Sequence, residues 1–93
     1  MNEYETVILI SDKITDAQRT EIFEKIKKLI GTNGNLLSTE ELGKKKMAYE
    51  VRKHTEAFYY VLNFESNASF IAELERNYRI IEEIIKFIVV KED

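Results

Sequence analysis

Two segments with the period of an α-helix, each lying between runs that favour β-strands, constrain most strongly what this chain can fold into. Their apolar positions are Ile22, Phe23, Ile26, Leu29 and Ile30 in the first segment, and Phe70, Ile71, Leu74, Tyr78 and Ile81 in the second. Short runs rich in β-branched and aromatic residues occupy 4–10, 58–64 and 84–90. Residues 35–51 form a longer extended segment, interrupted near Gly43. The predicted order is β-α-β-β-α-β.

Capping and turn residues give the expected boundaries of these elements. Thr15, followed three residues later by a glutamine, predicts a capping box at the start of the first helix. Gly31 and the pair at 33–34 are expected to end that helix. Residues 66–69 supply side chains to cap the second helix, and the polar stretch 52–57 is expected to form the reversal between the middle strands.

The predicted order leads to an α+β fold of the ferredoxin-like type. Each half is a strand, a crossover helix and a returning strand, and the right-handed crossover rule leaves few arrangements of two such halves. We expect a split β-α-β-β-α-β fold with four antiparallel strands, both helices on one face, and the second and fourth strands at the edges. At 93 residues without proline or a linker segment, the chain is expected to be one domain, residues 1–93.

The alternation along each strand predicts which side chains face the helices. The inward set is Ile8 and Ile10, then Phe58, Tyr60, Leu62 and Phe64, then Ile85, Phe87 and Val89. The outward set on the open face contains Val7, Leu9, Tyr59, Val61 and Ile88, flanked by Lys86. An apolar area on an open sheet indicates a partner surface, although scattered exposed aliphatic residues are normal on any protein.

Composition excludes several classes of protein. The chain has no cysteine, so disulfides, thiolate nucleophiles and zinc-thiolate sites are excluded. No apolar run is long enough to cross a bilayer, and the first residues do not resemble a signal peptide, so we expect a cytoplasmic protein with no membrane partner.

No catalytic constellation is found. His54 is the only histidine, and in a polar reversal it is expected to be a solvated loop residue rather than a base. The sequence has no Gly-rich phosphate loop and no cluster at metal-ligand spacing. The loop 11–16 lacks the glycine and arginine that acylphosphatases of this fold use, and residues 56–63 fail the third-strand signature of RNA-recognition motifs. We therefore expect that the chain is not an enzyme and that it binds no cofactor, metal or small-molecule substrate.

Positive charge is concentrated in one segment of an acidic chain. The net charge of −3 divides into +2 on residues 40–54, with five positive and three negative side chains, and −5 on all other residues. Because phosphate binding depends on Lys and Arg, an RNA interface on this chain would have to be local and to include this segment.

Several segments together resemble bacterial small-subunit ribosomal protein six, and the resemblance covers nearly the whole chain. They are Tyr4-Glu5, residues 42–51 (LGKKKMAYEV), 57–61 (AFYYV), 73–76 (ELER) with Arg79-Ile80, and 86–91 (KFIVVK). The second is similar to the family signature aromatic-Gly-basic-basic-x-Leu-Ala-Tyr-x-Ile, with Leu42 in place of a common tryptophan and Met47 in place of leucine. The resemblance implies a structural protein that binds the central domain of small-subunit ribosomal RNA as a heterodimer with ribosomal protein eighteen. Some members carry a longer tail than this chain, which ends at Asp93.

Two interpretations of Lys44, Lys45 and Lys46 follow from the sequence. Edge-strand lysines prevent sheets from pairing with one another, and lysines on an extended segment can also follow a phosphate backbone. The resemblance favours the RNA interpretation. The complete set of RNA-binding candidates is Lys44, Lys45, Lys46, Arg52, Lys53, Tyr59, Lys86 and Lys91. The candidates for protein contact are Met47, Ala48, Tyr49, Val7, Leu9, Val61 and Ile88.

Other hypotheses stay open on the residues alone. A ferredoxin-like regulatory module could bind a ligand or associate with itself, and a small hydrolase would need a convergent basic loop that the sequence does not show. The net negative charge outside residues 40–54 favours the ribosomal hypothesis, because an acidic surface can bind a basic neighbouring protein.

Overall fold

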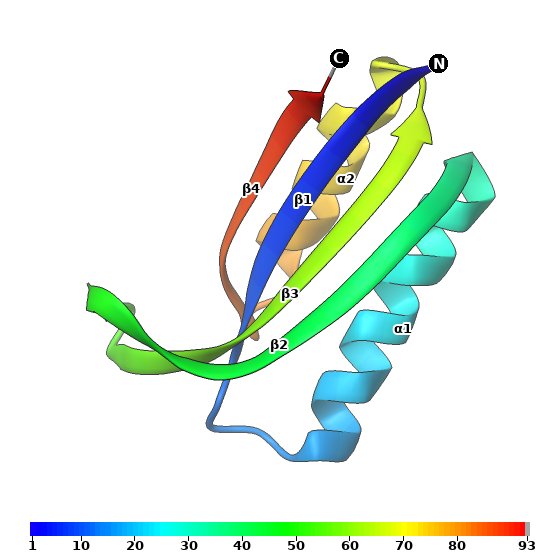
Figure 1. Ribbon diagram of the computed structural model, residues 1–93. Helices are drawn as coiled ribbons and strands as arrows, with labels where there is room; N and C mark the ends of the chain where they lie inside the picture. Colours follow the sequence, from blue (N-terminus) through cyan, green and yellow to red (C-terminus); the bar gives the residue numbers. More distant parts are fainter. Residues whose placement is uncertain (93) are drawn as a thin grey trace.

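The structure is a computed structural model that describes residues 1–92. Its elements are β1 (Asn2–Ser11), α1 (Asp16–Asn33), β2 (Gly34–Val51), β3 (His54–Ser66), α2 (Ser69–Ile80) and β4 (Ile84–Glu92). The four strands form one antiparallel sheet in the order β2-β3-β1-β4, so β2 and β4 are its edges. Both helices cover the same face (Figure 1). The predicted ferredoxin-like split fold is confirmed.

The main core lies between the sheet and the two helices. It contains the inward residues of β1 and β3 and the apolar faces of both helices, including Ile8, Ile10, Phe23, Ile26, Tyr60, Leu62, Phe64, Leu74 and Tyr78. One polar pair lies inside it: the Thr6 hydroxyl is 3.1 Å from the Tyr78 hydroxyl and donates to the carbonyl of Ile88 at 2.9 Å. Because the Thr6 hydroxyl donates its only proton to the Ile88 carbonyl, the Tyr78 hydroxyl is the donor in its bond to Thr6.

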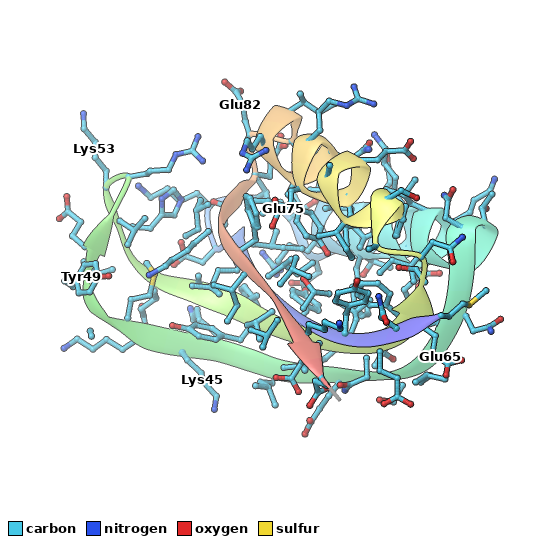
Figure 2. The ribbon with its side chains drawn as sticks, turned by 90° about the horizontal axis from the view of Figure 1, so that it is seen from above. Lys45, Tyr49, Lys53, Glu65, Glu75 and Glu82 are labelled. Carbon is cyan, nitrogen blue, oxygen red and sulfur yellow. The ribbon has the colours of Figure 1, made fainter. Side chains whose placement is uncertain are left out.

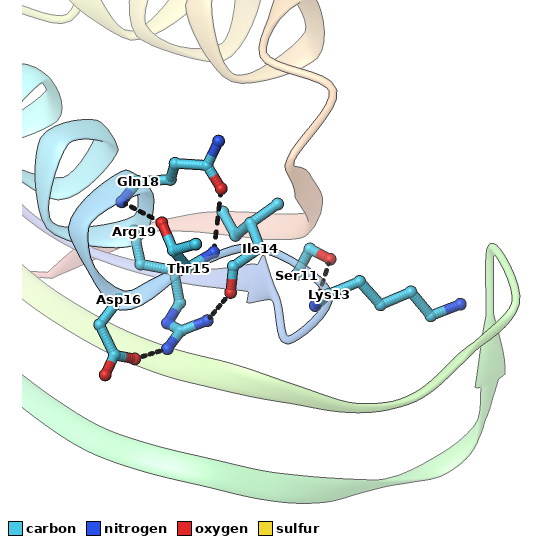
Figure 3. A network of polar contacts seen from close by, with 7 residues as sticks. All are labelled: Ser11, Lys13, Ile14, Thr15, Asp16, Gln18 and Arg19. Atoms are coloured by element: carbon cyan, nitrogen blue, oxygen red, sulfur yellow. Dashed lines mark hydrogen bonds and ion pairs between the residues drawn. The ribbon is translucent and has the colours of Figure 1, made fainter.

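The start of α1 follows the sequence prediction. The Thr15 hydroxyl accepts from the Gln18 amide at 3.1 Å, and the Gln18 side chain accepts from the Thr15 amide at 2.9 Å, which completes the capping box (Figure 3). Arg19 is buried beside this cap, where it donates to the Ile14 carbonyl at 2.7 Å, pairs with Asp16 and lies over the Phe58 ring. The cap and Arg19 therefore fix the end of the helix against the sheet.

The other helix boundaries agree with the prediction only in part. The first helix passes through Gly31, because a single glycine weakens a helix by only about 1 kcal/mol, and it ends at Asn33 with Gly34 as its C-cap, as expected from the pair at 33–34. No side chain caps α2, whose N-cap is Ala68, and the Ser66 hydroxyl donates to the Asn67 carbonyl instead. The prediction that 66–69 cap this helix by their side chains is wrong.

The reversal between β2 and β3 is shorter than expected. Only Arg52 and Lys53 form it, with φ values of +50° and +65°, and Val51 pairs with His54 directly across it. Residues 54–57 belong to β3. His54 is not a solvated loop residue: it is half-buried, with Nε2 2.8 Å from the Ser11 hydroxyl and Nδ1 2.9 Å from the Arg52 carbonyl. A two-residue turn of this kind requires positive φ, which Gly or Asn usually provides, so Arg52 and Lys53 carry no sequence signal for it.

A bulge changes the orientation of one predicted core residue. Leu9 pairs with Lys86 and Ile10 with Ile84, so Ile85 is an extra residue between two regular pairs. Ile84 therefore joins the helix-side core, and Ile85 packs on the opposite face. The prediction that Ile85 faces the helices is wrong, whereas Phe87 and Val89 do pack against that core.

Candidate nucleic-acid and protein interface

The open face of the sheet changes in character from one end to the other. Strand pairing arranges its outward residues in four rows across β4, β1, β3 and β2: Glu92-Glu3-Glu65-Asn35, Val90-Glu5-Asn63-Ser38, Ile88-Val7-Val61-Glu40 and Lys86-Leu9-Tyr59-Gly43. The first row contains three carboxylates, the third is mainly apolar and the fourth contains a lysine. Beyond the fourth row lie the lysines of β2. The face therefore runs from acidic through apolar to basic.

The distal part of the β2–β3 hairpin, residues 44–57, extends past the ends of the other two strands and curls (Figure 1). We call this part the hairpin arm. Lys45, Tyr49 and Lys53 lie along the arm, and Glu65 lies at the opposite end of the molecule (Figure 2). Because the arm curls over the open face, Tyr49 of β2 reaches Lys86 of β4: Lys86 Nζ is 3.3 Å from the Tyr49 hydroxyl and 5.3 Å from its ring centre.

A second apolar cluster fills the space beneath the arm. It consists of Leu9, Met47, Ala57 and Ile85, with Val7, Val51 and Tyr59 packed against it. The prediction that Leu9 is exposed is wrong, because only 7% of it is accessible, and Met47 is 8% exposed. Met47 belongs to the arm and is buried in the same cluster as Leu9 of β1, so neither residue offers a contact surface in this conformation.

The remaining apolar candidates stay accessible. Tyr49 is 66% and Ile88 is 49% exposed, and Ala48 is also exposed, whereas Val7, Val61 and Tyr59 are half-buried. Two shallow hollows share Leu9, Tyr59 and Lys86 as lining residues. One extends towards Ile88 and Val7, and the other extends beneath the arm towards Met47 and Tyr49. The expected clustering of apolar side chains on this face is confirmed.

The three consecutive lysines are exposed and point to alternate sides of β2. Lys44 pairs with Phe58 and Lys46 with Glu56, so these two lie on the helix side, whereas Lys45 pairs with Ala57 and lies on the open side. The lysines follow Gly43, whose φ of +79° accompanies a shift in the pairing of β2 with β3 between Glu41 and Gly43. The lysines therefore present positive charge on both sides of one sheet edge.

The other basic candidates do not form a single patch. Arg52 and Lys53 lie at the tip of the arm, where Arg52 Nη1 donates to the Ile84 carbonyl at 3.3 Å. Lys86 lies on β4 near the arm. Lys91 pairs with Tyr4 near the acidic end of the sheet, so it is separated from the other candidates along the strands.

The sequence reasoning missed two features of this interface. Lys13 Nζ donates to the Lys53 carbonyl at 3.0 Å and holds the turn in its positive-φ conformation. Glu3, Glu65 and Glu92 form the acidic row, although like charges directly opposite each other destabilise a sheet. The alternation along β1 and β3 is the sequence signal for Glu3 and Glu65 of this row, since both share the parity of Val7 and Val61.

No helix among residues 1–92 is long and apolar enough to span a membrane, and the same residues hold no group of three His, Asp or Glu side chains arranged to bind a metal.

The comparison with known protein families shows to which family the chain belongs. Residues 3–91 match the model of the family described as ribosomal protein S6. The chain belongs to the ribosomal protein S6 family. It is therefore a structural constituent of the small ribosomal subunit and not an enzyme, and the expected ribosome-associated, cytoplasmic localisation follows from that membership.

Relatives agree over the whole length of the chain. It is 38% identical to the small ribosomal subunit protein bS6 of Nitratiruptor, over 98% of this chain and 72% of that protein. It is 33% identical to bS6 of Caldanaerobacter subterraneus, over 100% of this chain and 99% of that protein. Ribosomal protein S6 from Thermotoga maritima superposes with a TM-score of 0.94 at 30% identity, over 98% of this chain and 87% of that chain.

Proposed function

We propose that this chain binds small-subunit ribosomal RNA, in its central domain, together with ribosomal protein eighteen as a heterodimer. The observation that carries the proposal is the gradient along the open face, from the acidic row through the apolar rows to the basic arm. A surface with two opposite charged ends suits two ligands of opposite charge. RNA belongs at the basic end, and a basic protein belongs at the acidic end.

The RNA contact is built on the edge and tip of the arm. Lys44 and Lys46 lie about 6.6 Å apart along the strand, since each residue of a strand advances about 3.3 Å. Lys45 points to the other side, and Arg52 and Lys53 extend the positive charge to the tip. All five side chains are exposed, so they can exchange counterions for phosphates without a rearrangement of the core.

The protein contact is built on the middle and the acidic end of the open face. Val7, Val61 and Ile88 form one cross-strand apolar row, and the Glu3 row lies two pairs further along the strands. No ion pair in the described part of the chain uses Glu3, Glu65 or Glu92. A basic partner would therefore relieve the repulsion in this row while it covers the apolar row.

The test measures RNA affinity with and without the partner. A fluorescent central-domain fragment of small-subunit RNA is titrated with the chain alone, with ribosomal protein eighteen alone, and with an equimolar mixture. We expect weak binding by the chain alone and binding by the mixture that is at least about tenfold tighter than by either protein, which corresponds to about 1.4 kcal/mol of coupling. Equal affinity of the chain with and without the partner would refute the cooperative assembly.

A further inference from the structure

The turn at the tip of the hairpin arm has a strained backbone. Arg52 and Lys53 both adopt the left-handed conformation, with φ of +50° and +65°, which is unfavourable for long side chains. A two-residue turn of this type normally selects Asn-Gly, whereas both positions here carry an exposed cation. Such strain persists only where the surrounding structure fixes the backbone, and it is typical of functional segments.

The carbonyl groups of both turn residues accept hydrogen bonds from side chains outside the turn. Lys13 Nζ, in the loop between β1 and α1, donates to the Lys53 carbonyl at 3.0 Å. His54 Nδ1 lies 2.9 Å from the Arg52 carbonyl, and because a carbonyl oxygen can only accept, Nδ1 is the donor in this bond. The turn is therefore held at two consecutive carbonyl groups.

The bond from His54 continues into the body of the molecule. With a proton on Nδ1, the neutral ring accepts through Nε2 from the Ser11 hydroxyl at 2.8 Å. The oxygen of this buried hydroxyl accepts from the Lys13 amide at 3.0 Å (Figure 3). The Ser11 amide donates to the Glu83 carbonyl at 2.8 Å, which fixes Ser11 itself. The chain after β1 thus reaches the turn by two routes, directly from Lys13 Nζ and through Ser11 and His54.

We propose that Ser11, Lys13 and His54 are positioning residues that hold Arg52 and Lys53 in the arrangement in which both cations bind phosphates of RNA. The three residues act through the turn and not by contact with RNA. The inference rests on the proposed RNA contact at the tip of the arm. A turn fixed before binding loses less conformational freedom when RNA binds, so its cations contribute more to affinity.

The two cations of the turn lie in different directions. Arg52 Nη1 donates to the Ile84 carbonyl at 3.3 Å, so this side chain is directed towards the start of β4. A guanidinium group has five N–H donors, so the others stay available to a phosphate. Lys53 points away from the body of the molecule (Figure 2). This arrangement suits contacts with two separate phosphates of one RNA backbone.

RNA affinity and turn geometry, measured on the same variants of the full chain, test the proposal. The RNA probe is the fluorescent central-domain fragment, with ribosomal protein eighteen present. His54→Leu removes both bonds of the ring, and Lys13→Met removes the direct bond to the Lys53 carbonyl. We expect each variant to bind RNA about three- to tenfold more weakly, because only a fraction of the turns is then in the competent conformation. The one-bond Cα–Hα coupling constants of Arg52 and Lys53, which distinguish positive from negative φ, should change at the same time.

Conservative variants separate positioning from charge. Lys13→Arg keeps a donor and a positive charge, and His54→Asn keeps a donor for the Arg52 carbonyl, so both should retain most of the wild-type affinity. Lys28→Met is the matched control for Lys13→Met, because it removes one positive charge from an exposed position of α1. It should leave both the affinity and the geometry of the turn unchanged. Lys13 is also exposed, so its replacement does not disturb the core.

The outcomes distinguish this proposal from the proposed function. Weaker RNA binding together with a changed turn supports it. If His54→Leu and Lys13→Met bind RNA like the wild type, positioning is overturned and RNA binding by the chain stands. Weaker binding with an unchanged turn would also overturn positioning and would indicate that these side chains touch RNA directly. A wild type that does not bind the RNA beside its partner would refute the proposed function, and this inference with it.

Discussion

Lys86 and Tyr49 touch although they belong to the two opposite edge strands of the sheet. The lysine Nζ lies 3.3 Å from the tyrosine hydroxyl and 5.3 Å from the centre of its ring. This contact is possible only because the hairpin arm curls over the open face. It closes the arm over Leu9, so that Leu9 and the arm residue Met47 are buried together on a face of the sheet that carries no helix.

Tyr49→Ala is expected to loosen the arm without unfolding the chain. The contact is exposed, so its loss should lower the free energy of unfolding by no more than about 1 kcal/mol. Amide hydrogen exchange at residues 47–51 should become faster, whereas exchange in β1 should not change. Tyr49→Phe, which keeps the ring under Lys86, is the control and should show a smaller effect. Unchanged exchange in the arm of Tyr49→Ala would show that the cluster beneath holds it alone.

Two glycines should respond in opposite directions to the same substitution. A Cβ at Gly31 meets nothing within 4 Å, so Gly31→Ala in α1 should stabilise the chain by up to about 1 kcal/mol. A Cβ at Gly34 would collide with the carbonyl oxygen of Glu65, which is backbone and cannot move freely. Gly34→Ala should therefore destabilise by about 1–3 kcal/mol. Urea unfolding measures both, and equal effects would contradict the close approach of β2 and β3 at Gly34.

The buried hydroxyl pair of Thr6 and Tyr78 predicts an order of stability. Tyr78→Phe removes one hydrogen bond and leaves the Thr6 proton on the Ile88 carbonyl, so it should cost about 1 kcal/mol. Thr6→Val removes both hydrogen bonds and leaves the Tyr78 hydroxyl without its partner in the core, so it should cost more, about 1–3 kcal/mol. Thermal and urea unfolding of both variants test the order. A Tyr78→Phe variant less stable than Thr6→Val would contradict the assigned direction of the bonds.

Alkaline pH should destabilise the fold partly through Tyr78. Burial raises the pKa of Tyr78 above its ordinary value of 10.0, and burial also raises the pKa of Tyr60, against the effect of nearby Arg19. Above pH 10 the unfolded chain releases a phenolic proton that the folded chain keeps, so the free energy of unfolding falls as the pH rises, by up to about 1.4 kcal/mol per pH unit for Tyr78. Below pH 10 these groups cause no change.

Tyr78→Phe should therefore show a shallower loss of stability between pH 10 and pH 11.5 than the wild type. Equal slopes for the wild type and Tyr78→Phe would show that other groups cause the alkaline loss.

The order of the elements could be predicted from the sequence because it depends on local signals. The apolar period around Phe23 and Leu74, and the capping box at Thr15, act over a few residues and were interpreted correctly. Ile85 could not be placed, because the bulge that reorients it depends on how β4 meets β1. The turn at Arg52 and Lys53 could not be predicted either. These residues adopt positive φ, and the contacts at the turn, from Lys13 to the Lys53 carbonyl and between His54 and the Arg52 carbonyl, come from the tertiary structure.

The candidate site was predictable in its composition but not in its shape. Strand parity alone predicts that Val7, Val61 and Ile88 share the open face of the sheet. The burial of Met47 was not predictable, because it results from the curl of the arm, and the curl depends on three shifts in pairing between β2 and β3. The sites of RNA and protein contact stay predictions.

The measurement that tests the central claim most directly is the salt dependence of RNA binding by the variant Lys44→Ala/Lys45→Ala/Lys46→Ala. Affinity for the central-domain RNA fragment is measured with ribosomal protein eighteen present, at several salt concentrations. The matched control replaces Lys25, Lys27 and Lys28 of α1 with alanine, which removes the same charge from the helix side. We expect the first variant to bind more weakly and its salt slope to fall by roughly one for each lost phosphate contact, while the control keeps the wild-type slope. Equal slopes for the two variants and the wild type would contradict the claim. They would indicate that these lysines only prevent the sheet edge from pairing with another sheet.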